Sequence, residues 1–144
     1  GSYQHDVDSK EWPLCWESWE DFHSWRKNEE QSKCIELLLD NTYPPTFRDA
    51  PTFTKKCRYI CSRGGKSRQP KPSTDKEKPA RTRKNPSKRI DCQCIVMVKE
   101  YPDTSKLLGY HVDTHNHELG NANLRFTRIP PETREYIAGL LRLK

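Results

Sequence analysis

The residues of this chain best suited to chemistry gather around one motif, His115-Asn116-His117, and the cysteines that precede it. Side chains at alternate positions of an extended strand project to the same side, so both histidines could reach one ion. Cys92 lies upstream with 22 residues between it and His115, and Cys61 lies upstream of Cys92 with 30 residues between them. Two thiolates and two imidazoles would form a tetrahedral Cys2His2 centre, for which zinc is the natural ion.

The choice of cysteine ligands is open on the residues alone. Cys57 falls on the same face of a predicted strand as Cys61, and Cys94 on the same face as Cys92. Either neighbour could therefore replace its partner as a ligand. A free cysteine on an inward strand face is more often a small buried hydrophobic residue.

Length and composition favour one small domain that needs a stabilising cross-link in addition to its hydrophobic core. The chain has 144 residues, of which 32% are hydrophobic and 32% are charged, so its core must be small. A bound metal ion can supply the missing stability. Six cysteines could instead form three disulfides in a secreted domain, but no signal peptide is visible and the opening Gly-Ser is typical of a cleavage scar. We expect a reduced, intracellular protein with no membrane segment.

Charge is distributed unevenly along the chain. Residues 63–89 carry eleven Lys and Arg against two acidic residues, a net of +9, whereas residues 1–40 carry ten acids against four bases, a net of −6. Such asymmetry indicates a basic surface for a polyanion beside an acidic face. A solvated loop with no specific partner is the plainer interpretation of a basic run.

The N-terminal third is expected to be a tail followed by an aromatic-rich helix. Residues 1–11 are polar and predict a disordered tail. Within the segment 12–33, Ser18 and Asp21 fit a capping box, and aromatic residues at helical spacing predict a helix over 19–31. The tryptophans of this segment supply large buried area, so we expect them in the core.

Segment 34–125 is expected to consist mainly of strands. Strands are predicted over 35–41, 52–63, 91–102 and 106–117, with a short final strand over 118–127. In the second of these, Cys57, Tyr59 and Cys61 should face the core while Lys56, Arg58 and Ile60 face away.

Two further segments complete the predicted architecture. The low-complexity segment 66–89 lacks apolar periodicity and predicts a basic insertion loop, and a C-terminal helix is predicted within 126–144, beginning near Pro131. The fold class expected is therefore α+β, a four- to five-stranded antiparallel sheet stapled by the metal, with helices before and after it.

The runs YICSRGG, around Cys61, and HNHELG, at the last two ligands, carry a family resemblance when joined by the C-x(30)-C-x(22)-H-N-H spacing. Over residues 34–125 the chain resembles the WRKY–GCM zinc-finger superfamily, in particular its FAR type and the DNA-binding domains of Mutator-like transposases. The resemblance implies one structural zinc ion held by Cys61, Cys92, His115 and His117. The W-R-K-Y heptapeptide is absent, so the base-reading residues of the plant members cannot be carried over.

The resemblance also implies a partner, double-stranded DNA, with a strand edge in the major groove and basic residues on the phosphates. Lys56 and Arg58 are the candidate groove contacts. The candidate backbone contacts are Arg63, Lys66, Arg81, Arg83, Lys84, Lys88 and Arg89. We therefore expect a nuclear protein, a transcription factor or part of a transposase, that binds specific DNA sequences.

Other classes of function fit the residues less well. Glu118 follows His117, but H-x-H-E is not the H-E-x-x-H spacing of a zinc hydrolase, and no nucleophile elbow or phosphate loop is present, so we expect no enzyme activity from this chain. The acidic, tryptophan-rich segment 12–33 could instead make the chain a protein-interaction module. RNA binding through the basic loop is a further alternative.

Overall fold

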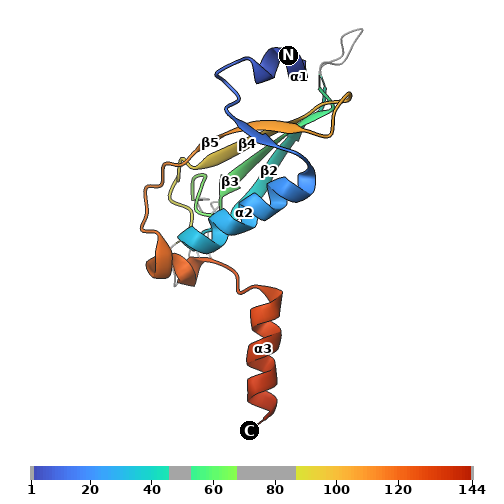
Figure 1. The fold of residues 1–144 in the computed structure, drawn as a ribbon. Coiled ribbons are helices and arrows are strands. Elements are labelled where there is room, and N and C mark those ends of the chain that lie inside the picture. Colours follow the sequence, from blue (N-terminus) through green and yellow to red (C-terminus); the bar gives the residue numbers. More distant parts are fainter. Residues whose placement is uncertain (1, 46–52, 68–86, 144) are drawn as a thin grey trace, which may run out of the picture.

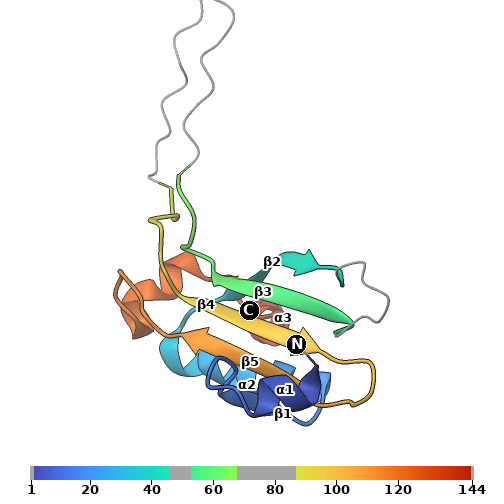
Figure 2. The ribbon, with the colours of Figure 1, turned by 90° about the horizontal axis from the view of Figure 1, so that it is seen from above.

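The fold is built on one antiparallel sheet, which the computed structural model describes over residues 2–45, 53–67 and 87–143. The sheet has five strands in the order β1-β5-β4-β3-β2 (Figures 1 and 2). The strands are β1 (Leu14–Trp16), β2 (Leu37–Tyr43), β3 (Lys55–Cys61), β4 (Ile95–Glu100) and β5 (Leu107–Val112). The predicted α+β class, with an antiparallel sheet and flanking helices, is confirmed.

Strand β3 shows why one face of the sheet is buried. Its residues alternate between buried and half-buried, so that Cys57, Tyr59 and Cys61 are buried while Lys56 and Arg58 lie on the other face. This is the alternation that the sequence predicted. The buried set is continued across the sheet by β4, in which Val96 and Val98 pair with residues of β3 and are fully buried.

Helix α2 (Trp19–Lys33) covers the buried face of the sheet, as Figure 1 shows. It begins where predicted, because the Ser18 side chain accepts a hydrogen bond of 3.3 Å from the Asp21 backbone N–H. Phe22 is fully buried, with its ring centroid 5.0 Å from that of Trp16 and 5.2 Å from that of Tyr59. The core therefore includes Trp16 and Phe22, with Trp19 and Trp25 packed against it, as predicted. Trp12 lies outside this cluster, with its ring centroid 5.3 Å from that of Tyr110.

The N-terminal tail differs from the sequence prediction, which made residues 1–11 disordered. Helix α1 (Tyr3–Val7) is folded against the sheet, and Asp6 is buried in an ion pair of 2.5 Å with Lys99 of β4. Asp6 also accepts a hydrogen bond from Tyr101. This polar segment is therefore held in place by a buried ion pair. Such a contact leaves no periodic pattern of apolar residues in the local sequence from which it could be predicted.

The C-terminal part also differs from the prediction. The final strand expected over 118–127 is wrong, because this segment forms the 3₁₀ helix η1 (Gly120–Phe126). It is anchored by Asn123, which is buried and donates a hydrogen bond of 2.8 Å to the Cys34 carbonyl. Helix α3 (Pro131–Arg142) begins at Pro131 as predicted but buries no residue and projects away from the sheet (Figure 1). Among the described residues, no helix has the length and hydropathy to cross a bilayer.

Candidate metal centre

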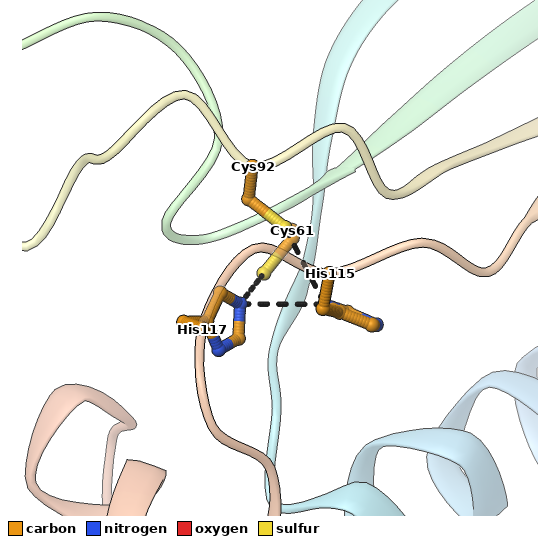
Figure 3. A group of neighbouring side chains, drawn as sticks. All are labelled: Cys61, Cys92, His115 and His117. Carbon is orange, nitrogen blue, oxygen red and sulfur yellow. Dashed lines mark hydrogen bonds between the residues drawn. The ribbon is translucent and has the colours of Figure 1, made fainter.

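The four predicted ligands come from three separate segments that meet at one end of the sheet (Figure 3). Cys61 is the last residue of β3, and Cys92 lies in the segment that leads into β4. His115 and His117 lie in the loop that follows β5. The prediction that the histidines end a strand is therefore wrong, since β5 stops at Val112 and a bend at Asn116 follows.

The side chains converge on a common point. Cys61 Sγ lies 3.3 Å from His117 Nε2, Cys92 Sγ lies 3.4 Å from His115 Nδ1, and these two ring nitrogens are 3.3 Å apart. All four ligand atoms lie within 4.8 Å of one another. Bond lengths of about 2.3 Å to sulfur and about 2.0 Å to nitrogen place tetrahedral ligands about 3.5 Å apart, which matches this spacing.

The hydrogen bonding of the histidines fits a metal centre. His117 Nδ1 lies 2.9 Å from the Glu118 carbonyl oxygen, so Nδ1 carries the proton and Nε2 keeps a lone pair toward the thiols. On His115 the roles are reversed, because Nδ1 points into the group while Nε2 is buried, makes no hydrogen bond and lies 3.5 Å from Asp113 Oδ1. Four potential electron-pair donors face one point, and this group could hold a metal ion.

The protonation of the group points the same way. Burial raises the pKa of the Cys61 thiol to about 11, and burial together with neighbouring His117 lowers the pKa of His115. Without a cation the site would therefore hold a neutral thiol and a neutral imidazole. A bound metal ion favours the thiolate and uses the neutral imidazole as it stands.

Backbone geometry brings the two cysteines together. The backbone N–H groups of Ile90 and Cys92 both donate to the Arg63 carbonyl, at 2.9 and 3.2 Å, and Asp91 donates to the Gly65 carbonyl at 3.0 Å. Gly64 lies close to the backbone of both cysteines. A Cβ on it would lie 2.9 Å from the Cys61 carbonyl oxygen and 3.3 Å from the Cys92 carbonyl oxygen. The CSRGG run thus forms a tight turn against the chain that carries Cys92.

The histidine loop is attached to the same turn. Asn116, between the two histidines, donates a hydrogen bond of 2.7 Å to the Ile90 carbonyl. Its neighbours on either side therefore point inward while Asn116 itself ties the loop to the cysteine segment. The H-N-H motif owes its convergence to this contact rather than to strand pleating.

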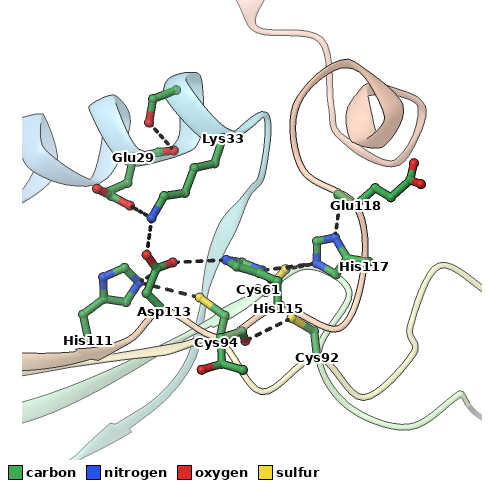
Figure 4. A network of polar contacts seen from close by, with 12 residues as sticks. Glu29, Lys33, Cys61, Cys92, Cys94, His111, Asp113, His115, His117 and Glu118 are labelled. Atoms are coloured by element: carbon green, nitrogen blue, oxygen red, sulfur yellow. Dashed lines mark hydrogen bonds and ion pairs between the residues drawn. The ribbon is translucent and has the colours of Figure 1, made fainter.

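A polar chain that the sequence did not predict supports His115 (Figure 4). Asp113 Oδ1 lies 3.5 Å from His115 Nε2, and Asp113 Oδ2 lies 2.6 Å from Lys33 Nζ. Lys33 also pairs with Glu29 at 2.6 Å, so the end of α2 is linked to the metal centre. A signal was present, because residues capable of ligation occupy alternate positions at His111, Asp113, His115 and His117.

The two cysteines that competed as ligands lie in different surroundings. Cys57 is buried in β3 with its sulfur 3.9 Å from the Thr42 hydroxyl, away from the metal group. Cys94 lies beside the group, and burial together with the thiols of Cys61 and Cys92 raises its pKa to about 12. None of the six cysteines, all of which the structure describes, forms a disulfide.

The predicted DNA contacts are placed unequally. Lys56 and Arg58 are half-buried on the sheet face opposite α2, where Arg58 pairs with Asp40 at 3.5 Å. Arg63 is engaged within the protein, because it donates to the Lys88 carbonyl at 3.0 Å and stacks 3.9 Å from the Phe126 ring. Three further candidate phosphate contacts, Lys66, Lys88 and Arg89, lie within the residues that the structure describes. Arg81, Arg83 and Lys84 lie outside the described residues.

No family model, curated protein or solved structure matches this chain. The family resemblance carried by the ligand spacing therefore stays a prediction.

Proposed function

We propose that this chain is a zinc-stapled β-sheet domain that binds specific sequences of double-stranded DNA, in a nuclear transcription factor or a transposase. The zinc is structural, because four protein ligands leave no open position for a substrate water. Mixed thiolate and imidazole ligation favours zinc over harder ions such as magnesium or calcium.

One observation carries the proposal of a polyanionic partner. The segment of net charge +9 has both ends fixed at the metal centre, since backbone hydrogen bonds join Arg63 to Ile90 and Gly65 to Asp91. Whatever path the residues between them take, their charge is tethered to the turn that carries Cys61 and Cys92. Phosphate contacts by Lys and Arg supply most of the non-specific affinity for DNA.

The sheet offers a surface beside this charge. Lys56 and Arg58 project from the face that α2 leaves uncovered, and Arg58 lines a hollow together with Ile60, Gly65 and Ile95. Because β3 lies between β2 and β4, these side chains would approach the major groove from the face of the sheet, where arginine can read guanine with two hydrogen bonds. Duplex DNA in preference to RNA rests on the family resemblance.

The alternative of a protein-docking surface in segment 12–33 receives no support from the side chains. Trp16 is buried, and Trp19 and Trp25 pack against the core. These three tryptophans therefore cover the sheet, while Trp12 packs beside Tyr110.

Selection from a random duplex DNA pool, with zinc present and near-physiological salt, tests the proposed function. We expect one enriched motif, bound at least about 10³-fold more tightly than bulk DNA. A duplex competitor should displace the selected DNA, and single-stranded RNA of the same length should not. Retention without enrichment would leave a non-specific polyanion binder, and no retention would contradict the proposal.

A further inference from the structure

A second group of potential metal ligands lies beside the first and has no role in it. Cys94 Sγ is 3.7 Å from His111 Nε2, and that nitrogen is 3.8 Å from Asp113 Oδ1. The three ligand atoms all lie within 4.8 Å of one another (Figure 4). These separations are close to the value of about 3.5 Å expected for ligands of one tetrahedral zinc ion.

The surroundings of this group suit a metal. Cys94 is fully buried and the His111 side chain is only 11% exposed, so both are held in place by the core. The Trp25 ring packs edge-on to the His111 ring, with their centroids 5.3 Å apart, and fixes the orientation of the imidazole. Asp113 is 48% exposed and leaves the group open to solvent on one side. An ion could enter by that side.

The carboxylate can serve this group without giving up its other contacts. Lys33 Nζ holds Oδ2 of Asp113 at 2.6 Å, which leaves Oδ1 facing both His111 Nε2 and His115 Nε2. A carboxylate oxygen has two lone pairs, so Oδ1 can bind a cation while it stays 3.5 Å from His115 Nε2. Asp113 would then be a ligand of one centre and a negatively charged neighbour of a ligand of the other.

We propose that Cys94, His111 and Asp113 form a second zinc site, adjacent to the Cys2His2 centre and independent of whether the protein binds DNA. One thiolate, one imidazole and one carboxylate favour zinc over magnesium or calcium. With three protein ligands, the fourth position is open to water. The second ion therefore binds more weakly than the first and exchanges more readily.

Titration of the metal-free, reduced full chain with zinc, followed by native mass spectrometry, tests the site. We expect the wild-type chain to bind a second ion after the first, and the Cys94→Ala variant to lose only that second ion. Cys57→Ala is the matched control, since Cys57 is a buried strand cysteine outside both ligand groups, and it should keep both ions. Binding of a single ion by the wild-type chain would overturn the proposal, and so would a second ion retained by Cys94→Ala.

Cobalt provides a readout that does not depend on the stability of one variant. Thiolate-to-cobalt charge-transfer absorption should rise with the first equivalent and rise again with the second, as the Cys94 thiolate binds. His111→Gln should also lose the second ion while its far-UV circular dichroism stays that of the wild type. If cobalt absorption saturates with the first equivalent in the wild-type chain, Cys94 is simply a thiol that donates to His111 Nε2, and the second site does not exist.

Discussion

Cys61 and His117 are 56 positions apart in the sequence, yet Cys61 Sγ lies 3.3 Å from His117 Nε2. The contact joins the end of β3 to the loop that follows β5, two strands separated in the sheet by β4. An ion bound there would cross-link segments that the chain brings together only through its tertiary fold. Its contribution to stability is therefore coupled to folding.

Removal of the metal should unfold the sheet. Structural zinc contributes on the order of 10 kcal/mol in small zinc domains, which is comparable with the whole stability of a folded domain. A strong chelator, or the substitution Cys61→Ser, should abolish cooperative thermal unfolding monitored by far-UV circular dichroism. Cys15→Ser, at an exposed cysteine outside both ligand groups, should behave as the wild type. A chelated protein with unchanged, cooperative unfolding would contradict a structural role for the metal.

The turn at Gly64 should not tolerate a side chain. A Cβ there would lie 2.9 Å from the Cys61 carbonyl oxygen, and that oxygen belongs to the backbone of the cysteine turn, which cannot move aside freely. Gly64→Ala should therefore displace Cys61 or Cys92 and destabilise the protein by about 1–3 kcal/mol, with weaker metal binding. Chemical denaturation and competition with a chelator measure the two effects.

Gly139 provides the matched control for Gly64. It lies inside α3, and a Cβ on it would meet no atom within 4 Å, so Gly139→Ala should stabilise the helix by up to about 1 kcal/mol. Equal effects of the two substitutions would show that the close approach at Gly64 is unimportant.

If the chain binds DNA as proposed, Lys88 and Arg89 should contribute to the salt dependence of that binding. Each phosphate contact releases about one counterion, so replacing both residues with alanine should reduce the slope of log K against log salt by roughly two. Fluorescence anisotropy across a range of salt concentrations measures the slope. Lys27→Ala, at an exposed position on α2, should leave it unchanged. An unchanged slope in the double variant would remove both residues from the interface.

The buried pair of Asp6 and Lys99 should make stability depend on pH. Burial alone would raise the pKa of Asp6, but hydrogen bonds from Lys99 and Tyr101 outweigh it and hold the pKa below its usual value of 3.8. Because the folded-state pKa is depressed, the pair stabilises the protein above that usual value and the contribution is lost as pH falls through the folded-state pKa.

Asp6→Asn isolates this contribution. At neutral pH it leaves the Lys99 ammonium buried without its counter-charge and should cost about 3 kcal/mol. The difference between wild type and variant should be constant above about pH 5 and should narrow toward acid, as measured by denaturant titration at each pH. Asp103→Asn, in an exposed turn, should have no such effect. A difference that does not vary between about pH 2 and pH 7 would contradict the assignment.

The amino-acid sequence determined the parts of this protein that depend on neighbouring residues. Alternation placed Cys57, Tyr59 and Cys61 on the core face of β3, and Ser18 set the start of α2. Both follow from local periodicity and local hydrogen bonding, which a sequence displays directly. The residues alone left the choice of cysteine ligands open, and the set implied by the family resemblance is the one that the structure brings together.

Only the tertiary structure decided the contacts between distant residues. Asp6 pairs with Lys99, 93 positions away in the sequence, and Lys33 pairs with Asp113, 80 positions away. No local sequence pattern therefore predicts either ion pair. The histidine loop likewise takes its shape from the hydrogen bond between Asn116 and the Ile90 carbonyl, not from the strand that precedes it. Buried charges and polar side chains are stable only when they have partners, and in this fold those partners come from residues distant in the sequence.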